Sequence, residues 1–544
     1  MSFTRFGLSW PARIQEADTD SAPAALALSW RVMLAVLSGL MLCAPWLQPA
    51  MFWTAWIGWV PLLFALSGAS YSRSLLLGWV AGTVCFAGAS HWMIDFAVNL
   101  KGVSWPMGAL LAVFFWSYVG GATALGCVLY RWLSERLPGL DVLSFPCAIL
   151  AVLSAYPLLF QTHFAEAQVF FLPGIQAVDL VGAQGMDFIM LVASALAFEL
   201  LRRSGRRWLS VAAGLALALW FGYGWVSLNS WDERVADWET RRIGLVQPND
   251  AVSLDLPPPA PGFSREEPEE MVATRRLAKL GAQWIAWPEA RYKGYFDMYS
   301  VRRGYAEEMS GLGVPLIFHD VERRWEETGR VSYNSVALLD THGELAGTYR
   351  KMQRMPFGEY LPAFFHLPGL KALSDLFLGE FLQPLTPGAE HAYFQIADMQ
   401  VVPKVCYETA FPAFIAEAVG GDAAGRVLLF LSQDGWFGET SQPFQHKAMS
   451  IVRGVENRVP MVHLINNGPS VATTPSGRTV AQTQAFSRAQ LLVDLPFSAT
   501  SGGSFYSRHP HLAALLMYCL LAGLVGLALW HPSRRSSQTT SPAQ

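Results

Sequence analysis

Seven apolar runs fill the first 230 residues of this chain, and each is long enough to cross the hydrocarbon core of a bilayer. In lipid, the backbone polar groups of such a run are satisfied when it forms a helix. We place the runs near residues 29–48, 51–70, 74–93, 106–131, 142–161, 179–201 and 207–228, with an eighth near 511–531. The sequence therefore predicts a multi-span bundle of eight helices, which agrees with 52% hydrophobic and only 15% charged residues.

The basic residues of the connecting loops are distributed unevenly between the two sides of this bundle. One side carries Arg5, Arg13, Arg31, Arg73, Arg131, Arg136, Arg202, Arg203, Arg206, Arg207, Arg534 and Arg535. The other side is poor in Lys and Arg, with Lys101 as the main exception. Because basic loops stay in the cytoplasm, we expect both termini there and the long segment after the seventh span outside it. Residues 1–27 do not resemble a cleavable signal peptide, so the first span is expected to direct insertion.

Between residues 231 and 506 the pattern changes to that of a soluble α/β domain, large enough to bury its own core. Helical stretches such as 266–280 and 411–419 alternate with β-rich runs. These runs lie at 243–246, 284–287, 315–318, 335–339, 401–405, 427–431, 462–465 and 490–493. The Pro-rich run 256–261 indicates an exposed arm or loop. Residues 361–387 could dip into the membrane interface or pack into the core.

These features predict five consecutive segments in the chain. They are a cytoplasmic N-terminal segment (1–28), a seven-helix transmembrane region (29–230), an extracytoplasmic α/β domain (231–506), an eighth transmembrane helix (507–531) and a cytoplasmic tail (532–544). A net charge of −3 provides no basic field for a nucleic acid, so no nucleic-acid partner is expected. The cysteines lack the CxxC-type spacing of a structural zinc site, so no metal is expected either.

One cysteine differs from the others in its surroundings. Cys43, Cys85, Cys127, Cys147 and Cys519 lie in long apolar runs, where a thiol behaves as a small hydrophobic side chain. Cys406 is the only one in the polar segment, directly after the predicted strand 401–405, and has no partner there for an internal disulfide. A lone thiol at a strand end is a candidate nucleophile. A buried structural cysteine would give the same local pattern.

Two other predicted strands also lead into charged side chains, at Glu289 and Lys351. Charged residues at the tips of apolar strands tend to share a cleft at one edge of the sheets. In such a cleft a glutamate can take the proton of the thiol, because the thiolate is the nucleophile. An ammonium lowers the pKa of the thiol and stabilises a developing oxyanion. Taken singly, Glu289 could be a surface residue, and Lys351 could belong to a solvated basic patch.

Four short motifs follow one another in an order that resembles the nitrilase superfamily. They are Trp287-Pro288-Glu289, Lys351 ahead of Pro-Phe-Gly-Glu-Tyr-Leu-Pro at 356–362, Cys406-Tyr407-Glu408, and Gln-Asp-Gly-Trp-Phe-Gly at 433–438. Residues 445–468 add further matches. With seven spans before this domain and one after it, the whole chain resembles the apolipoprotein N-acyltransferase family, the membrane-integrated branch of that superfamily. The resemblance implies an αββα sandwich for the extracytoplasmic domain.

The resemblance also implies a role for each matching residue. Glu289 would be the general base, Lys351 the transition-state stabiliser and Cys406 the nucleophile. Glu359 would orient Lys351 and assist the proton path. The flanking and pocket-wall positions would be Tyr407, Glu408 and Trp436. For Trp436, simple packing of its Gly-Trp-Phe-Gly turn is an equally good interpretation.

The chain departs from the family pattern in two places. After the first predicted strand it has Gln247-Pro248-Asn249-Asp250 and then no tryptophan at 254–257, where the family has a Lys-Trp on a mobile arm. A late Asn-Thr-Gly of the family is Asn466-Asn467-Gly468 here. The first departure concerns contact between the arm and the substrate. Neither affects the three expected catalytic positions.

The reaction implied by the resemblance is an acyl transfer in two steps. Cys406 would attack the ester of a phospholipid acyl donor, and a lysophospholipid would leave. The thioester would then acylate the α-amino group of the diacylglyceryl-cysteine of an apolipoprotein, with Glu289 taking the proton of the amine. Such a course predicts ping-pong kinetics and requires no cofactor. The expected location is the inner membrane of a bacterium, with the α/β domain on the periplasmic side.

Three other functions remain open from the sequence. The first is a membrane-bound amidase that hydrolyses a C–N bond with the same three residues, although eight spans exceed what tethering needs. The second is a transporter or scaffold with an appended nitrilase-like domain. It is disfavoured because the main ionisable residues of the spans, Asp95, Asp179 and Asp187, lie near predicted span ends. The third is a specialised paralogue that acylates a different amine.

Overall fold

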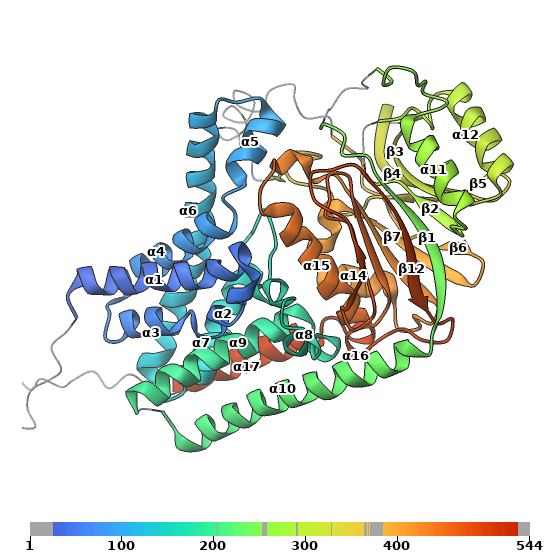
Figure 1. Cartoon of the computed structure of the whole chain (residues 1–544). Coiled ribbons are helices and arrows are strands. Elements are labelled where there is room, and N and C mark those ends of the chain that lie inside the picture. Colours follow the sequence, from blue (N-terminus) through green and yellow to red (C-terminus); the bar gives the residue numbers. More distant parts are fainter. Residues whose placement is uncertain are drawn as a thin grey trace, which may run out of the picture.

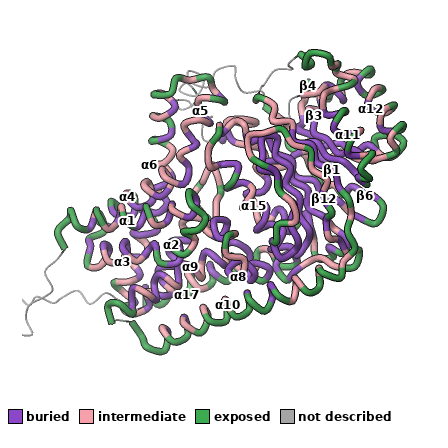
Figure 2. Tube along the Cα trace, in the orientation of Figure 1, coloured by how far each residue is buried: buried purple, intermediate pink, exposed green. Residues whose placement is uncertain are grey.

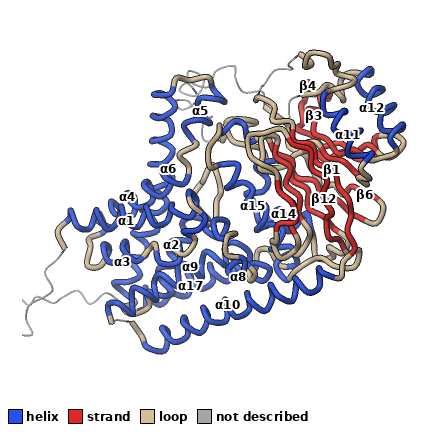
Figure 3. Tube along the Cα trace, viewed as in Figure 1, coloured by secondary structure: helices blue, strands red, loops and turns tan. Residues whose placement is uncertain are grey.

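The computed structural model describes residues 26–203, 205–252, 258–289, 292–327, 329–363, 367, 369, 371 and 384–530. The expectations for the N-terminal segment before residue 26, the arm at 253–257, most of 361–387 and the tail after residue 530 lie outside these residues. Long helices form one half of the molecule, and two sheets with their covering helices form the other (Figure 1; Figure 3).

The helical half consists of long apolar helices joined by short helical pieces. Its elements are α1 (Leu28–Leu47), η1 (Pro49–Met51), α2 (Thr54–Ile57), α3 (Val60–Leu66), α4 (Tyr71–Ala89), α5 (Met93–Lys101), α6 (Trp105–Arg136), α7 (Asp141–Ala155), η2 (Phe164–Gln168), α8 (Leu172–Ile175), α9 (Val178–Arg202), α10 (Arg207–Ala236) and α17 (Leu512–Trp530). Seven segments of the described chain are long and apolar enough to span a membrane, counting η1 to α3 as one, and α7 is a shorter apolar helix. These eight segments correspond to the eight predicted spans.

Several predicted span limits are wrong. The second span, 51–70, is not one helix but the broken segment from η1 to α3. The fifth, 142–161, ends as helix α7 at Ala155, because Pro157 disfavours helical geometry at Tyr156, which is extended. The seventh continues beyond residue 228 to Ala236. Helix α6 has 32 residues and is about 48 Å long, so it extends beyond a hydrocarbon core of about 30 Å.

Small residues allow the two central helices α4 and α6 to approach closely. A Cβ on Gly78 would lie 2.8 Å from the Cα of Ala124, and one on Gly82 would lie 2.9 Å from the Cα of Gly120. Such close backbone packing is typical of helices in membranes, where lipid offers no hydrophobic drive for association. Helix α10, in contrast, carries large exposed apolar side chains such as Leu215, Leu219 and Val226 on one face. Figure 2 colours much of this helix as exposed. That face suits contact with lipid rather than water.

The second half contains two six-stranded sheets. The first has the order β12-β1-β2-β3-β4-β5 and the second β11-β10-β9-β8-β7-β6. The strands are β1 (Glu239–Gln247), β2 (Trp284–Ala286), β3 (Leu316–Glu326), β4 (Gly329–Leu339), β5 (Leu345–Arg350), β6 (Phe394–Ile396), β7 (Met399–Val405), β8 (Arg426–Ser432), β9 (Met461–Ile465), β10 (Val471–Thr473), β11 (Thr479–Gln482) and β12 (Ala489–Phe497). All eight predicted β-rich runs fall on strands of these sheets.

The two sheets pack face to face with helices on both outer sides. Apolar side chains such as Ile243 and Trp284 of the first sheet meet Val401 and Leu429 of the second in one buried core. Helices α11 (Glu269–Lys279) and α12 (Tyr299–Leu312) cover the first sheet, and α14 (Pro412–Val419) and α15 (Gln442–Asn457) cover the second (Figure 1). This is the expected αββα sandwich. Strands β1, β2 and β3 run parallel, as do β7, β8 and β9, so their ends meet at common edges.

Buried charges attach the sandwich to the helical half through α15. The guanidinium of Arg453 lies 3.2 Å from Glu166 of η2 and 3.0 Å from Glu456, and all three side chains are fully buried. Glu456 in turn accepts a 2.7 Å hydrogen bond from the backbone N–H of Ala183 in α9. Arg458, just after α15, forms a 2.8 Å ion pair with Asp179. Asp179 therefore contributes to this interface.

Replacing Arg453 with Met should reduce the free energy of unfolding by about 3–5 kcal/mol, because it leaves two buried carboxylates without their cation. The measurement is the unfolding of the full-length protein in detergent, followed by tryptophan fluorescence. Arg488→Met is the matched control, since its ion pair with Glu269 is exposed and contributes little. Equal effects of the two substitutions would contradict a structural role for the buried pair.

Candidate active site

The predicted nucleophile begins a sharp turn at the end of a central strand. Strand β7 ends at Val405, and Cys406 starts the 3-10 turn η5 (Cys406–Ala410), which leads into α14. The backbone of Cys406 has φ 47°, in the left-handed region that non-glycine residues rarely adopt. Such strained positions persist only where surrounding contacts fix them. The thiol is 6% exposed.

Glu408 is one of the residues that fix this turn. Its fully buried carboxylate accepts hydrogen bonds from the backbone N–H of Val405 at 2.8 Å, from the hydroxyl of Tyr349 at 2.7 Å and from the backbone N–H of Met352 at 2.8 Å. It therefore ties the end of β7 to the segment after β5, which carries Lys351. Sequence reasoning predicts only that Glu408 flanks the nucleophile, and these contacts explain how it positions both strand ends.

The side chains of Lys351, Glu359 and Glu289 lie close together, and the side-chain amide of one further residue bonds to both carboxylates. Lys351 is 2% exposed, and its Nζ donates a 2.9 Å hydrogen bond to Glu359. The side-chain amide of Asn334, on β4, donates to Glu359 at 2.9 Å and to Glu289 at 2.8 Å. Glu289 also accepts a 3.1 Å bond from the backbone N–H of Gln433. Asn334 is a site residue that sequence reasoning missed, because a polar residue inside a strand gives no local signal.

The charges at this site favour a protonated thiol in the resting protein. Burial lowers the pKa of Lys351, but Glu359 and then Glu289 reverse this and raise it above its ordinary value. Burial and the Glu289 carboxylate raise the pKa of the Cys406 thiol well above its ordinary value, and Lys351 lowers it in part. The sulfur therefore needs a base to become a nucleophile. Glu289 is the carboxylate with the largest effect on it.

A second buried pair lies on the other side of the nucleophile, and sequence reasoning assigned it no role. His446 of α15 faces the Asp434 carboxylate at 2.9 Å through Nδ1. Its Nε2 lies 3.1 Å from the carbonyl oxygen of Cys406 and 2.7 Å from the hydroxyl of Thr409. The Cys406 sulfur, an Asp434 oxygen and a His446 nitrogen lie within 4.8 Å of one another. A metal ion bound there would have to displace one of the existing histidine contacts.

Cys406 opens into a cavity of about 500 Å³ between the two halves of the molecule. Cys406, Tyr407 and Thr409 line it from the sandwich. The helical half contributes apolar side chains, including Phe86, Phe115, Val119, Leu150, Leu153 and Phe160. The hydroxyl of Tyr407 donates a 2.7 Å hydrogen bond to the carbonyl of Leu159, in the irregular segment after α7. The helical half therefore provides a large share of the apolar wall of the cavity, and Phe411, Phe414 and Phe437 of the sandwich contribute to it as well.

Trp436 lies beside this cavity, and the next residue, Phe437, lines it. Phe437, in the turn η6 (Asp434–Phe437), is a lining residue and packs edge-on against Trp92 with ring centroids 5.0 Å apart. Trp436 packs in the same apolar cluster, and its carbonyl accepts a 3.2 Å hydrogen bond from Asn99 of α5. A direct contact of Trp436 with substrate stays a prediction.

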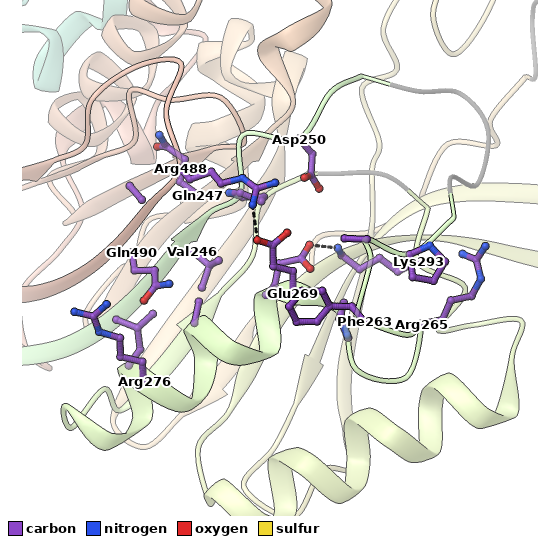
Figure 4. Close-up of a pocket in the computed structure, with 18 of the residues that line it drawn as sticks. Val246, Gln247, Asp250, Phe263, Arg265, Glu269, Arg276, Lys293, Arg488 and Gln490 are labelled. Carbon is purple, nitrogen blue, oxygen red and sulfur yellow. Dashed lines mark hydrogen bonds and ion pairs between the residues drawn. The ribbon is translucent and has the colours of Figure 1, made fainter.

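A separate cavity of about 440 Å³ lies between β1, α11 and the start of β12 (Figure 4). Charged side chains line it, and Arg488 and Lys293 form ion pairs with Glu269 and Glu270 respectively. Gln247, at the end of β1, also faces it. None of the three predicted catalytic residues lines this cavity, whereas Cys406 lines the one described above.

The two packed sheets, the gathered Glu289, Lys351 and Cys406 and the bundle of membrane helices define a membrane-integrated protein of the nitrilase superfamily. The family model for carbon-nitrogen hydrolases matches residues 250–502, and the model for the N-terminal domain of apolipoprotein N-acyltransferase matches residues 38–196. The chain belongs to the apolipoprotein N-acyltransferase family.

Curated relatives match over nearly the whole chain. The apolipoprotein N-acyltransferase of Geobacter metallireducens is 29% identical over 521 residues, covering 91% of this chain and 94% of that protein. The enzyme of the same name from Pseudomonas aeruginosa is 28% identical over 509 residues, covering 90% and 94% respectively. Among solved structures, an amidase of the nitrilase superfamily from Nesterenkonia is 20% identical, with a TM-score of 0.35, and covers 51% of this chain and 97% of its own.

Replacing Lys351 with Met should slow alkylation of Cys406 by iodoacetamide at pH 8 by about tenfold or more, because each unit of increase in the pKa of the thiol reduces the thiolate fraction tenfold. Alkylation is followed at the Cys406 peptide by mass spectrometry, so the other cysteines do not interfere. Lys447→Met is the matched control, since that ammonium bonds to Gln482 instead. An unchanged rate in Lys351→Met would rule out the electrostatic role of Lys351.

Proposed function

We propose that this protein transfers an acyl chain from a phospholipid, through a thioester on Cys406, to the α-amino group of the diacylglyceryl-cysteine of apolipoproteins. The observation that carries this proposal is the cavity above Cys406, a large share of whose apolar wall comes from the membrane-helix half. A nucleophile in that position can receive an acyl chain that stays in contact with the bundle. A soluble substrate would require no such wall.

The first half-reaction uses the groups gathered around the thiol. Glu289 takes the proton from Cys406, and the sulfur attacks the ester carbonyl carbon of the phospholipid. The Lys351 ammonium, held by Glu359, stabilises the negative charge that develops on the carbonyl oxygen. When the C–O bond breaks, the proton held by Glu289 passes to the departing oxygen, and a lysophospholipid leaves. The acyl chain remains on Cys406 as a thioester.

The second half-reaction reuses the same groups. The neutral α-amino group of the apolipoprotein attacks the thioester carbonyl, and Glu289 takes the proton that the amine must lose. The C–S bond then breaks, an amide forms, and the proton returns to the Cys406 thiolate. Both half-reactions balance with groups of the protein and its two substrates. Catalytic roles for Glu289, Lys351 and Cys406 and a supporting role for Glu359 are therefore part of this proposal.

We infer from the distribution of basic loops that the sandwich lies on the periplasmic side of a bacterial inner membrane, with both chain termini in the cytoplasm. An even number of spans supports this inference: α7 is a shorter apolar helix, and seven further segments of the described chain are long and apolar enough to cross a membrane. The division into a transmembrane region, a catalytic domain at about 231–506 and a final membrane helix follows from this arrangement. Both substrates then reach Cys406 from the periplasmic leaflet.

The decisive experiment is to incubate the purified protein with a phospholipid of defined acyl chains and to measure the mass of the Cys406 peptide. We expect an acyl adduct that disappears when a diacylglyceryl-cysteine peptide is added, as that peptide becomes N-acylated. Cys406→Ser should form no thioester and should fail to restore N-acylation in cells depleted of their own enzyme. The rival amidase predicts release of ammonia from small amides and no acyl adduct from phospholipid. That result, obtained with folded protein, would exclude the acyl transfer.

A further inference from the structure

The side chain of His446 contacts the backbone of the turn that carries the nucleophile. The carbonyl of Cys406 points toward α15, where it lies 3.1 Å from Nε2 of His446. The hydroxyl of Thr409 donates a 3.1 Å hydrogen bond to the same carbonyl and lies 2.7 Å from the same nitrogen. His446 is 4% exposed, and Thr409 is fully buried. This network closes the left-handed turn that starts at Cys406.

The contacts of the His446 ring determine its protonation state. Nδ1 faces the carboxylate of Asp434, and Nε2 faces the carbonyl of Cys406, and both of these groups can only accept a hydrogen bond. The Thr409 hydroxyl, which lies 2.7 Å from Nε2, donates its hydrogen to the same carbonyl and therefore accepts from the ring. Both nitrogens therefore carry a hydrogen, and the ring is an imidazolium. Burial disfavours this charge, but the Asp434 carboxylate outweighs it and raises the pKa of His446 above its ordinary value.

Few other titratable groups face this ring. His463 of β9 packs edge-on against it with ring centroids 4.6 Å apart, and the nitrogens of His463 lie 2.7 Å from Ser432 and 3.0 Å from Ser450. Burial lowers the pKa of His463 well below its ordinary value, so it stays neutral beside the imidazolium. Glu289, across the site, adds to the effect of Asp434.

We propose that His446 is a positioning residue for the nucleophile, which acts as an imidazolium held by Asp434 to fix the Cys406 turn and to place a second positive charge beside the sulfur. Lys351 lies on the side of the first sheet, directly after β5. His446 lies on the other side of the sulfur, on α15, which covers the second sheet. The proposal rests on the proposed use of Cys406 as the nucleophile. It is independent of which ester or amine the protein accepts.

The position of His446 in the chain connects the nucleophile to the membrane helices. The preceding residue, Gln445, accepts a 3.0 Å hydrogen bond from the indole N–H of Trp92 and donates a 2.8 Å hydrogen bond to the carbonyl of Ala89. These two residues lie at the end of α4 and beside α5, and they line the cavity at Cys406. Consecutive residues of α15 thus hold the cavity wall and the nucleophile turn. A displacement of α15 would change both together.

The test compares alkylation of Cys406 by iodoacetamide across pH 6–10 in the full-length protein in detergent. His446→Gln keeps a hydrogen-bond donor of similar reach but removes the charge. We expect its curve of log rate against pH to be shifted by about one unit toward higher pH relative to the wild type. The nearby positive charge is lost, and the Asp434 carboxylate then raises the pKa of the thiol without a cation to offset it. Thioester formation from phospholipid at neutral pH should fall by about tenfold for the same reason.

His463→Asn is the matched control, because it removes a buried histidine from the same cluster without a contact to the Cys406 turn. We expect it to lower thermal stability and to leave the pH curve of alkylation in place. Both variants are compared at a temperature at which they are folded, because an unfolded chain would expose Cys406 as an ordinary, reactive thiol. An unshifted curve in His446→Gln, or an equal shift in His463→Asn, would overturn the proposal.

The result also separates this proposal from the proposed acyl transfer. A shifted alkylation curve together with a missing phospholipid adduct in the wild type would support the role of His446 and refute the acyl donor. A normal phospholipid adduct with an unshifted curve in His446→Gln would support acyl transfer and refute the charge on His446.

Discussion

The site depends on one ammonium group that is almost completely removed from water. A buried, unpaired ammonium is unstable by several kcal/mol, and Lys351 is stable there because Glu359 bonds to it directly and Glu289 lies within electrostatic range. Asn334 holds both carboxylates in place through one amide. Burial and these same negative charges raise the pKa of the nearby thiol well above its ordinary value and keep it protonated. The charges that make the lysine stable thus also make the sulfur unreactive until a base accepts its proton.

This arrangement requires the two halves of the molecule to be fixed relative to one another. The cavity above Cys406 has its nucleophile on the sandwich and much of its apolar wall on the helical half, so sliding of one half would open it to water. The buried pairs of Arg453 and Arg458 with residues of η2 and α9 oppose such sliding. A single membrane anchor would tether the domain but could not form this wall. In the proposed reaction, several membrane helices are therefore needed to hold the acyl chain beside Cys406.

The sequence predicts those parts of the protein that follow from local pattern. Apolar runs of sufficient length become helices, β-branched runs become strands, and Cys406 is identifiable because it is the only cysteine in a polar region. What it does not predict are the contacts that depend on distant partners. Asn334 is an ordinary polar residue of a strand until Glu289 and Glu359 lie beside it. His446, between Gln445 and Lys447 on an amphipathic helix, acquires its role only when the Cys406 turn packs against α15.

The size of the cavity bears on the order of the reaction. At about 500 Å³ it falls within the range typical of a site for one small ligand, whereas the proposed donor and acceptor each carry at least two acyl chains. A cavity of this volume cannot enclose the acyl chains of both lipids. Direct transfer between them would require a cavity large enough for two substrates side by side. A covalent thioester removes that requirement, because the first substrate leaves before the second enters, and the protein keeps only the chain that is to be transferred. The ping-pong course thus follows from the space available beside Cys406 as much as from the chemistry of its sulfur.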